Sequence, residues 1–503
     1  MTADAFGTAA LRAAVLGAWR ASPARLREDA NTEEDHAHGY YRDRVLVELA
    51  QNAADAATRA DVPGRLLLRL ARADDGTIAL VAANTGAPLD AEGVASLSSM
   101  RASSKRDTGA RVVGRFGVGF AAVRAVADEV SLLSTTGGVR FSARDTAELL
   151  SEAAADVPAL AEEVRRRDGS LPSLRLPLPA DGRPPEGYDT AVVLQLRDEV
   201  FADEVRVLLR EVGDPLLLAL PGLVEILVED HTSDAPARRI ADVHERWVVE
   251  SAEGELSVAV VADRPVEERS ARSWRVTWAV PRDPALSWLP VVHAPTPTDE
   301  PCSVPALFVA TLPLDPTRRH VAAGRLADVV LEHAADAYAR LAQARADADA
   351  DPLSLVPTGL AAGTLDATLR DLVVERLART PLLRRAAPST SDLVAPDRAV
   401  MLAGGVGTQR TALAALGRRI AGLVVVPSGR QAQARTLGVE ERSLADVVEE
   451  LPVVDDGTWA ELYDALEPVA DDSQAREALG ALPVPLADGR VVRGARGLVV
   501  LDP

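Results

Sequence analysis

Residues 48–56 read ELAQNAADA, a stretch in which apolar and polar residues recur with the period of a helix. Five residues of this predicted helix share one face within roughly 100°: Glu48, Asn52, Asp55, Ala56 and Arg59. Two acids, an amide and a base on one stripe are a poor choice for packing in an apolar core. On a helix that stands alone, such a stripe is more typical of a solvated outer face than of a binding site.

A glycine-rich turn follows at residues 114–120, which read GRFGVGF and lead into a predicted helix over 117–128. Glycines let a backbone close on an anion, and the free N–H groups at the start of a helix hold phosphate. The G-x-x-G-x-G order matches neither the dinucleotide fingerprint nor the P-loop. Considered singly, the turn is weak evidence for a nucleotide site.

Residues 81–89, VAANTGAPL, lie between these two stretches and predict an apolar strand that ends at Asn84. A polar side chain there, with Gly86 two residues on, lets a planar ligand approach the backbone. By itself the stretch is more often an ordinary turn. Any interpretation therefore depends on the order and spacing of the three stretches together.

In this order the three stretches resemble the ATP-binding domain of the GHKL superfamily, which includes gyrase, MutL, histidine kinases and the ninety-kilodalton heat-shock chaperone. GRFGVGFAAVRAVADEVSLLST is similar to the heat-shock chaperone branch, and the set with NTGAPL and RASSK is most similar to the sacsin-type subgroup. The close resemblance covers about residues 40–140, and the general layout continues to about 350. It implies an α+β fold that begins with a GHKL (Bergerat) α/β sandwich, with helices on one face of a mixed sheet.

The resemblance also implies a role for each matched position. Glu48 would orient the attacking water as a general base, and Asn52 would supply its amide oxygen to Mg²⁺. Asp55 would lie near the phosphates or order the helix, with Ala56 beside it in the ATP site. Asn84 and Gly86 would face the adenine, and the backbone N–H groups of the glycine turn would hold the phosphates: Gly114, Arg115, Phe116, Gly117, Val118, Gly119 and Phe120.

Two positions depart from the family pattern. Most members carry Asp where Asn84 stands, and a carboxamide accepts a hydrogen bond from adenine without charge assistance. Pro88 replaces a glycine and stiffens the loop. These departures predict weaker adenine binding than is usual in the superfamily.

Two further candidate residue sets carry positive charge. Lys105 is the only lysine among 55 Lys and Arg residues, and it falls in the stretch 95–113 that the resemblance makes a lid over ATP. Its flexible ammonium suits contact with a γ-phosphate, with chance placement as the alternative. In related chaperones an arginine of the second domain reaches the γ-phosphate, and Arg318 or Arg319 would do so here. A segment of this kind is more often a turn that makes no contact with phosphate.

The length of 503 residues predicts about three domains. We expect the ATP-binding domain over 1–235, a middle α+β domain over 236–350 and a C-terminal α/β region of unknown role over 351–503. DADADP at 347–352 is the predicted linker.

Local patterns predict the elements of the first domain. They indicate a helix over 40–60, then strands over 65–73 and 77–84 joined by a turn at Asp74-Asp75-Gly76. A second hairpin turns at Gly137-Gly138, and a helix is expected near 147–166.

Composition limits the classes of function. Apolar residues make up 47% and aromatic residues 3%, so the cores are expected to consist of Ala, Val and Leu. A net charge of −20 argues against binding along a nucleic-acid backbone. The single cysteine, Cys302, excludes a disulfide within the chain and a thiolate metal site. With no signal pattern and no long apolar run, we expect a cytoplasmic protein without a membrane span.

The leading interpretation is a Mg²⁺-dependent, slow ATPase that closes a lid and rearranges the second domain, as chaperones do with client proteins. The alternative is a module in a stress or defence complex that binds nucleotide without hydrolysing it. A histidine kinase fits poorly because Glu48 stands where those kinases carry Asn, and a gyrase-like DNA role fits poorly with the charge of −20. A homodimer is expected by family analogy alone.

Overall fold

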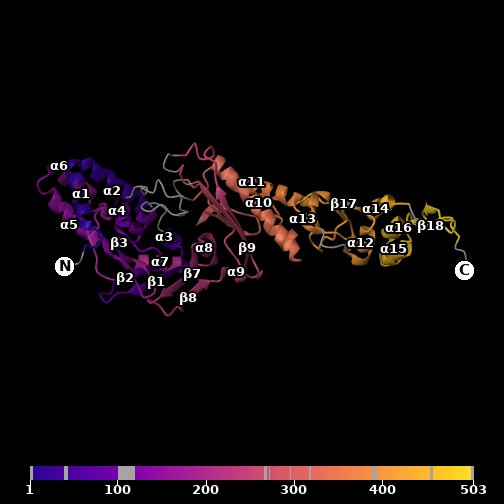
Figure 1. Cartoon of the computed structure of the whole chain (residues 1–503), viewed down its shortest axis with the longest axis horizontal. Coiled ribbons are helices and arrows are strands. Elements are labelled where there is room, and N and C mark those ends of the chain that lie inside the picture. Colours follow the sequence, from indigo (N-terminus) through magenta and orange to yellow (C-terminus); the bar gives the residue numbers. More distant parts are fainter. Residues whose placement is uncertain are drawn as a thin grey trace.

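The computed structural model arranges the chain as an elongated molecule, with an N-terminal sheet at one end and C-terminal helices at the other (Figure 1). Among the helices described, none combines the length and apolar character that crossing a membrane requires. The structure describes residues 4–38, 44–99, 119–264, 269–270, 272–294, 296–315, 319–387, 393–453 and 457–499.

The N-terminal sheet is mixed, with the strand order β5-β4-β3-β6-β2-β1-β7-β8. The pair β1–β7 is parallel, and the other neighbouring pairs are antiparallel. The strands are β1 (Gly64–Arg72), β2 (Ile78–Asn84), β3 (Ala127–Ser134), β4 (Gly137–Ser142), β5 (Leu178–Pro179), β6 (Thr190–Leu196), β7 (Leu223–Asp230) and β8 (Arg238–Ala241).

Helices cover one face of this sheet. Leu66 and Leu68 of β1 share an apolar core with Leu49 and Ala53 of α3, and small side chains on α3 let it lie close to the strands. On the other face, Leu67 packs in a separate small cluster with side chains of neighbouring strands. The helices of this region are α1 (Thr8–Ala21), α2 (Pro23–His38), α3 (Val45–Ala60), α4 (Ala91–Ser99), η2 (Gly119–Ala125), α5 (Ala143–Ala154), α6 (Pro158–Arg167), η3 (Ser173–Arg175), α7 (Glu199–Glu211) and α8 (Asp214–Ala219).

A second mixed sheet follows, with the strand order β12-β11-β13-β10-β9. Helix α10 packs on β9 and β10, and α11 packs on α10. These elements bury a second core around Trp278, Phe308 and Tyr338. The elements are α9 (Val243–Arg246), β9 (Trp247–Glu255), β10 (Ser273–Pro281), β11 (Val291–His293), β12 (Pro297–Pro301), β13 (Leu307–Ala310), α10 (Arg325–Asp347), η5 (Pro352–Leu355) and α11 (Thr364–Arg379).

The C-terminal region consists of short helices and two-stranded ladders. Most of its apolar residues form a third core, in which Trp459 packs beside Tyr463. The elements are β14 (Leu383–Arg384), β15 (Leu393–Val394), η6 (Pro396–Arg398), β16 (Val400–Leu402), η7 (Gly405–Thr408), α12 (Arg410–Gly417), α13 (Gln431–Thr436), β17 (Glu440–Arg442), α14 (Leu444–Glu450), α15 (Trp459–Leu466), η8 (Glu467–Val469), α16 (Ser473–Leu479), β18 (Pro483–Pro485) and β19 (Val491–Arg493).

The fold class expected from the sequence is confirmed at its coarser level: the chain is α+β and begins with a mixed sheet that helices cover on one face. The hairpin of β1 and β2 is also confirmed, with Ala73 and Gly76 closing the turn between them. Helix α3 agrees with the predicted helix from Val45 onward.

Two predicted elements of the first domain are wrong in their extent. The helix expected over 117–128 is a 3₁₀ helix that ends at Ala125, because β3 pairs with β6 from Ala127 onward. The helix expected near 147–166 is two helices, α5 and α6, since Pro158 starts a new helix and Val157 is not helical.

The second hairpin turns at Thr135-Thr136 rather than at the two glycines that follow. Gly137 and Gly138 are the first residues of β4 and pair with β3. A Cβ on Gly138 would lie 2.5 Å from the carbonyl oxygen of Ala180, so glycine here serves a close backbone approach instead of a turn.

The first sheet continues past residue 235, because β8 pairs with β7. The segment 347–352 does not separate folded units. Leu353 and Leu355, which follow it, are buried with α10 and α11 in the second core. Asp351 within it pairs with Arg430 at 2.7 Å.

A cavity of about 140 Å³ lies where the first sheet domain meets the second sheet. Leu46 and Val47 of α3, the α7–α8 turn and the β11–β12 turn line it. His293 at this cavity is 3% exposed, and its Nε2 has no hydrogen-bond partner among the residues that the structure describes. Burial lowers the pKa of His293 to about 4, while a hydrogen bond with the Leu289 backbone opposes that shift.

We expect this histidine to make stability depend on pH. Its pKa is lower in the folded than in the unfolded chain, so the unfolded chain takes up the proton first as pH falls below 6.5. Between pH 6.5 and 4 the wild type should lose about 3 kcal/mol of unfolding free energy more than His293→Gln. Urea unfolding at a series of pH values measures this difference.

The matched control for that measurement is His244→Gln, which removes an exposed histidine. This control should keep the pH dependence of the wild type. Equal pH dependence in the wild type and His293→Gln would contradict the prediction.

Candidate functional site

Helix α3 carries the predicted polar stripe, and its members differ in exposure. Glu48 and Asn52 are half-buried, whereas Asp55 is only 1% exposed. A buried carboxylate excludes the solvated outer face as the explanation of the stripe, because such a group stays in the interior only with polar partners. In the C-terminal half of α3, Asp55 therefore faces inward.

Arg59 stands one helical turn after this carboxylate, and the residue as a whole is exposed. Partial burial of its guanidinium group lowers the pKa of Arg59, and the charges of Asp55 and Asp90 oppose that change. Asp90 belongs to the loop after β2, so Arg59 lies between charges from two elements. The stripe on α3 is thereby linked to the loop that follows Asn84.

The loop after β2 lies directly against the backbone of α3. Ala87 donates its N–H to the carbonyl oxygen of Ala56 at 2.9 Å. Gly86 has φ +129°, and a Cβ there would lie 2.5 Å from the carbonyl carbon of Ala56. The structure therefore brings together two stretches that the sequence analysis singled out. The close approach at Gly86 is made by α3.

Asn84 ends β2 and is 9% exposed. Its Nδ2 donates to the carbonyl oxygen of Thr85 at 3.2 Å, while the Thr85 hydroxyl accepts the Arg65 N–H at 2.9 Å. The amide nitrogen of Asn84 thus has a local acceptor. This orientation leaves Oδ1 as the atom of the side chain that can accept from a ligand.

The sequence analysis missed three polar residues beside Asn84. Thr190 lies opposite both Asn84 and Ser134 in the strand register, and the hydroxyls of Ser134 and Thr190 are 3.1 Å apart. Asp189 accepts the Gly86 N–H at 2.8 Å through its carboxylate and donates its own N–H to the Asn84 carbonyl at 2.9 Å. Thr190 is the first residue of β6, whose pairing with β2 and β3 is a long-range property that no local pattern gives.

The glycine turn is described only from its last glycine. Gly119 begins η2, which packs against α2 and α3. The side chain of Phe120 is 4% exposed and packs in the core, with its ring centroid 6.5 Å from that of Phe141. Residues 95–99 of the predicted lid are the last residues of α4. The other site residues predicted in the turn and the lid lie outside the described part: Lys105, Gly114, Arg115, Phe116, Gly117 and Val118.

Of the two arginines predicted to reach the γ-phosphate, Arg318 lies outside the described ranges. Arg319 pairs with Asp299 at 2.6 Å, and its N–H donates to Asp315. In this structure Arg319 is thus held at the second sheet by carboxylates of its own domain.

At the predicted magnesium site, oxygen atoms would have to bind the metal ion. No group of three or more His, Cys, Asp and Glu in the described chain could hold a metal ion. Glu48 and Asn52 stand one helical turn apart and are both half-buried. A carboxylate and an amide oxygen fit Mg²⁺, which takes few protein ligands and keeps several waters.

No family model and no curated protein matches this chain.

The contact of Gly86 with α3 yields a prediction about stability. Gly86→Ala should lower the free energy of unfolding by at least about 3 kcal/mol, since it adds a backbone clash to an unfavourable φ. Gly76→Ala is the matched control, because Gly76 also has positive φ but has open space around a Cβ. The control should lose about 1 kcal/mol.

Chemical unfolding of both variants provides the measurement. Equal losses for Gly86→Ala and Gly76→Ala would show that the approach to α3 is not tight in solution.

Proposed function

We propose that this chain is a Mg²⁺-dependent ATPase of the GHKL type, with slow turnover and a chaperone-like role. The observation that supports it best is the docking of the Gly86–Ala87 loop on Ala56 of α3. That contact joins the polar stripe of α3 to the polar strand ends at Asn84. Helix η2, which begins at the last glycine of the predicted phosphate-binding turn, also contacts α3.

The polar strand ends are the proposed place for the base of the nucleotide. Oδ1 of Asn84 would accept a hydrogen bond from an amino group of the base, next to the hydroxyl pair of Ser134 and Thr190. Asp189 supports this corner because it fixes the N–H of Gly86. All of these groups belong to β2, β3 and β6 or to residues directly beside them, so a rigid sheet positions them.

Glu48 is the proposed general base. Its carboxylate, half-buried on the first turn of α3, would accept the proton of the water that attacks the terminal phosphate. Asn52, one turn further on, would contribute its amide oxygen to the hydrated metal. The metal, when bound, would neutralise charge on the phosphates.

The alternative function remains a module that binds nucleotide without hydrolysing it, in which partner assembly is the output. The hydrogen bonding of Asn84 favours this alternative. Its side-chain nitrogen already donates to the Thr85 carbonyl oxygen, and a carboxamide holds a base less strongly than a carboxylate does. Under either function, client or partner proteins would respond to the nucleotide state of the first domain. A homodimer is part of the same proposal.

Glu48→Ala separates the two functions. In the wild type we expect Mg²⁺-dependent ATP binding and slow turnover. The variant should keep its affinity for ATP within about threefold and lose turnover by about 10²–10⁴, which is the range for a general base. Calorimetric titration measures the affinity, and release of phosphate measures the turnover.

Glu199→Ala is the control because it removes an exposed carboxylate that pairs with Arg72 outside the site. It should leave binding and turnover unchanged. Wild-type binding without turnover would favour the non-hydrolysing module. Absence of ATP binding by the wild type would contradict both functions.

A further inference from the structure

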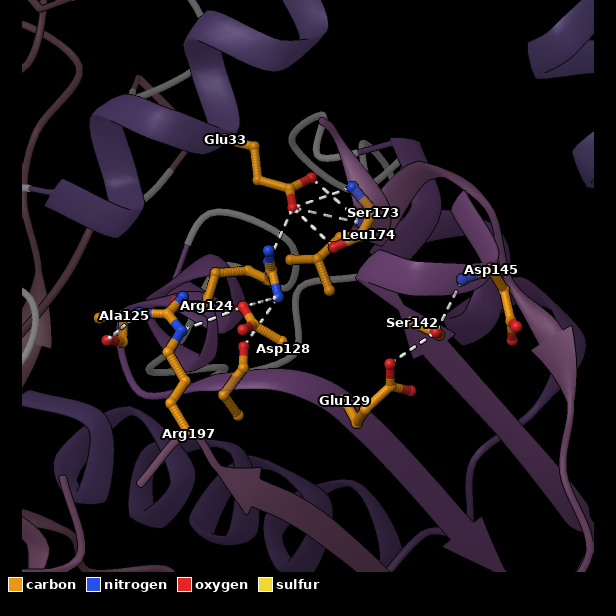
Figure 2. A network of polar contacts seen from close by, with 11 residues as sticks. Glu33, Arg124, Ala125, Asp128, Glu129, Ser142, Asp145, Ser173, Leu174 and Arg197 are labelled. Atoms are coloured by element: carbon orange, nitrogen blue, oxygen red, sulfur yellow. Dashed lines mark hydrogen bonds and ion pairs between the residues drawn. The ribbon is translucent and has the colours of Figure 1, made fainter. Parts of the chain in front are cut away.

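Glu33 of α2 is a buried carboxylate away from the polar stripe of α3. It is 3% exposed and accepts hydrogen bonds at 3.1 Å from the N–H and the hydroxyl of Ser173 and from the N–H of Leu174. Arg124 of η2 donates to it through Nε at 3.1 Å. Figure 2 shows these donors converging on the one carboxylate from two separate segments of the chain.

The same arginine fixes the end of η2. Arg124 also donates to the carbonyl oxygen of Ala127 at 2.8 Å and to Asp128 at 3.2 Å. Arg197, at the end of β6, donates to the carbonyls of Ala125 and Arg124 and pairs with Asp128 at 3.0 Å (Figure 2). Helix η2 is thus held at its C-terminal end by two guanidinium groups.

Residues Ser173 and Leu174, which donate to Glu33, lie at η3, and η3 contacts the end of α4. Arg175 of η3 donates to the carbonyl oxygen of Ser98 at 3.3 Å and pairs with Asp29 of α2 at 3.2 Å. Its side chain is 8% exposed. One buried polar network therefore joins α2, η2, η3 and the last turn of α4.

Stability alone is a poor explanation of this network. Burial raises the pKa of Glu33, and Arg124 and the donors of η3 oppose that change. Because burying charge is costly, a buried ion pair often contributes little net stability compared with apolar packing. Its best-supported use is to specify one arrangement of the elements that it joins.

We propose that Glu33 is a positioning residue for the nucleotide site. It fixes η2, whose first residue Gly119 is the last glycine of the predicted phosphate-binding turn, relative to α4 and α2. This inference rests on the proposed function. It extends that function to the buried polar network that joins α2, η2 and η3.

Glu33→Gln tests the proposal because it keeps the shape of the side chain and removes its charge. Glu163→Gln is the matched control, since Glu163 is also buried at 5% exposure and links the same helix α2 to α6 through Arg27. Its hydrogen bonds come from Arg27, and it also pairs with Arg167.

We expect Glu33→Gln to weaken ATP binding at least tenfold and Glu163→Gln to leave it within twofold. Without nucleotide, hydrogen exchange of the amides of Ala121–Ala125 should be faster in Glu33→Gln than in the control. Ser173→Ala, which removes a single hydrogen bond to the carboxylate, should weaken ATP binding about twofold to fivefold and covers the case in which Glu33→Gln does not fold.

The outcomes separate the inference from the function it rests on. If the wild type binds ATP and both glutamine variants bind it equally well, the positioning role is wrong and the proposed function stands. If the wild type does not bind ATP, the proposed function fails. In that case, faster exchange of Ala121–Ala125 in Glu33→Gln alone would still support a positioning role for η2, and equal exchange in both variants would reject it.

Discussion

The contact between Gly86 and the backbone of α3 is the constraint on which the rest of the candidate site depends. A loop can reach the carbonyl of a helix residue only where both partners lack bulky side chains, and here Gly86 meets Ala56 and Ala57. The hydrogen bond from Ala87 to Ala56 then fixes the loop. Because β2 enters this loop at Asn84, the same contact sets the distance between the end of β2 and the polar stripe of α3.

Small side chains also allow close packing of backbones elsewhere in the first domain. The chain has few aromatic residues, and the face of α3 toward the sheet is rich in alanine, including Ala50, Ala53 and Ala54. An interior of small residues brings helix and strand backbones close, so polar groups on α3 come near the strand ends. The same closeness buries Asp55, whose polarity alone would place it at the surface.

Sequence patterns predicted the elements whose determinants are local. The β1–β2 hairpin follows from its Asp-Asp-Gly turn, and α3 follows from its helical spacing. The pairing of Thr190 with Asn84 and Ser134 could not be predicted, since strand register depends on contacts between distant segments. The extent of η2 was missed for a similar reason: Arg197 from a distant strand holds the carbonyls at its end. Two of the three motif stretches meet in the structure, and the third is described only from Gly119.

The junction between the first two domains differs physically from the cores on either side of it. Leu217 and Leu218 of α8 pack in the first core together with Ala279 of the second sheet, so part of the junction is continuous apolar packing. Beside it, the cavity at the first turn of α3 is lined by Thr296 and His293, each with a buried polar atom that has no hydrogen-bond partner within the described ranges. A relative shift of the domains breaks fewer favourable contacts at such a place than within either core. The cavity reaches Val47, next to Glu48, so the junction lies directly beside the turn of α3 that carries the proposed general base.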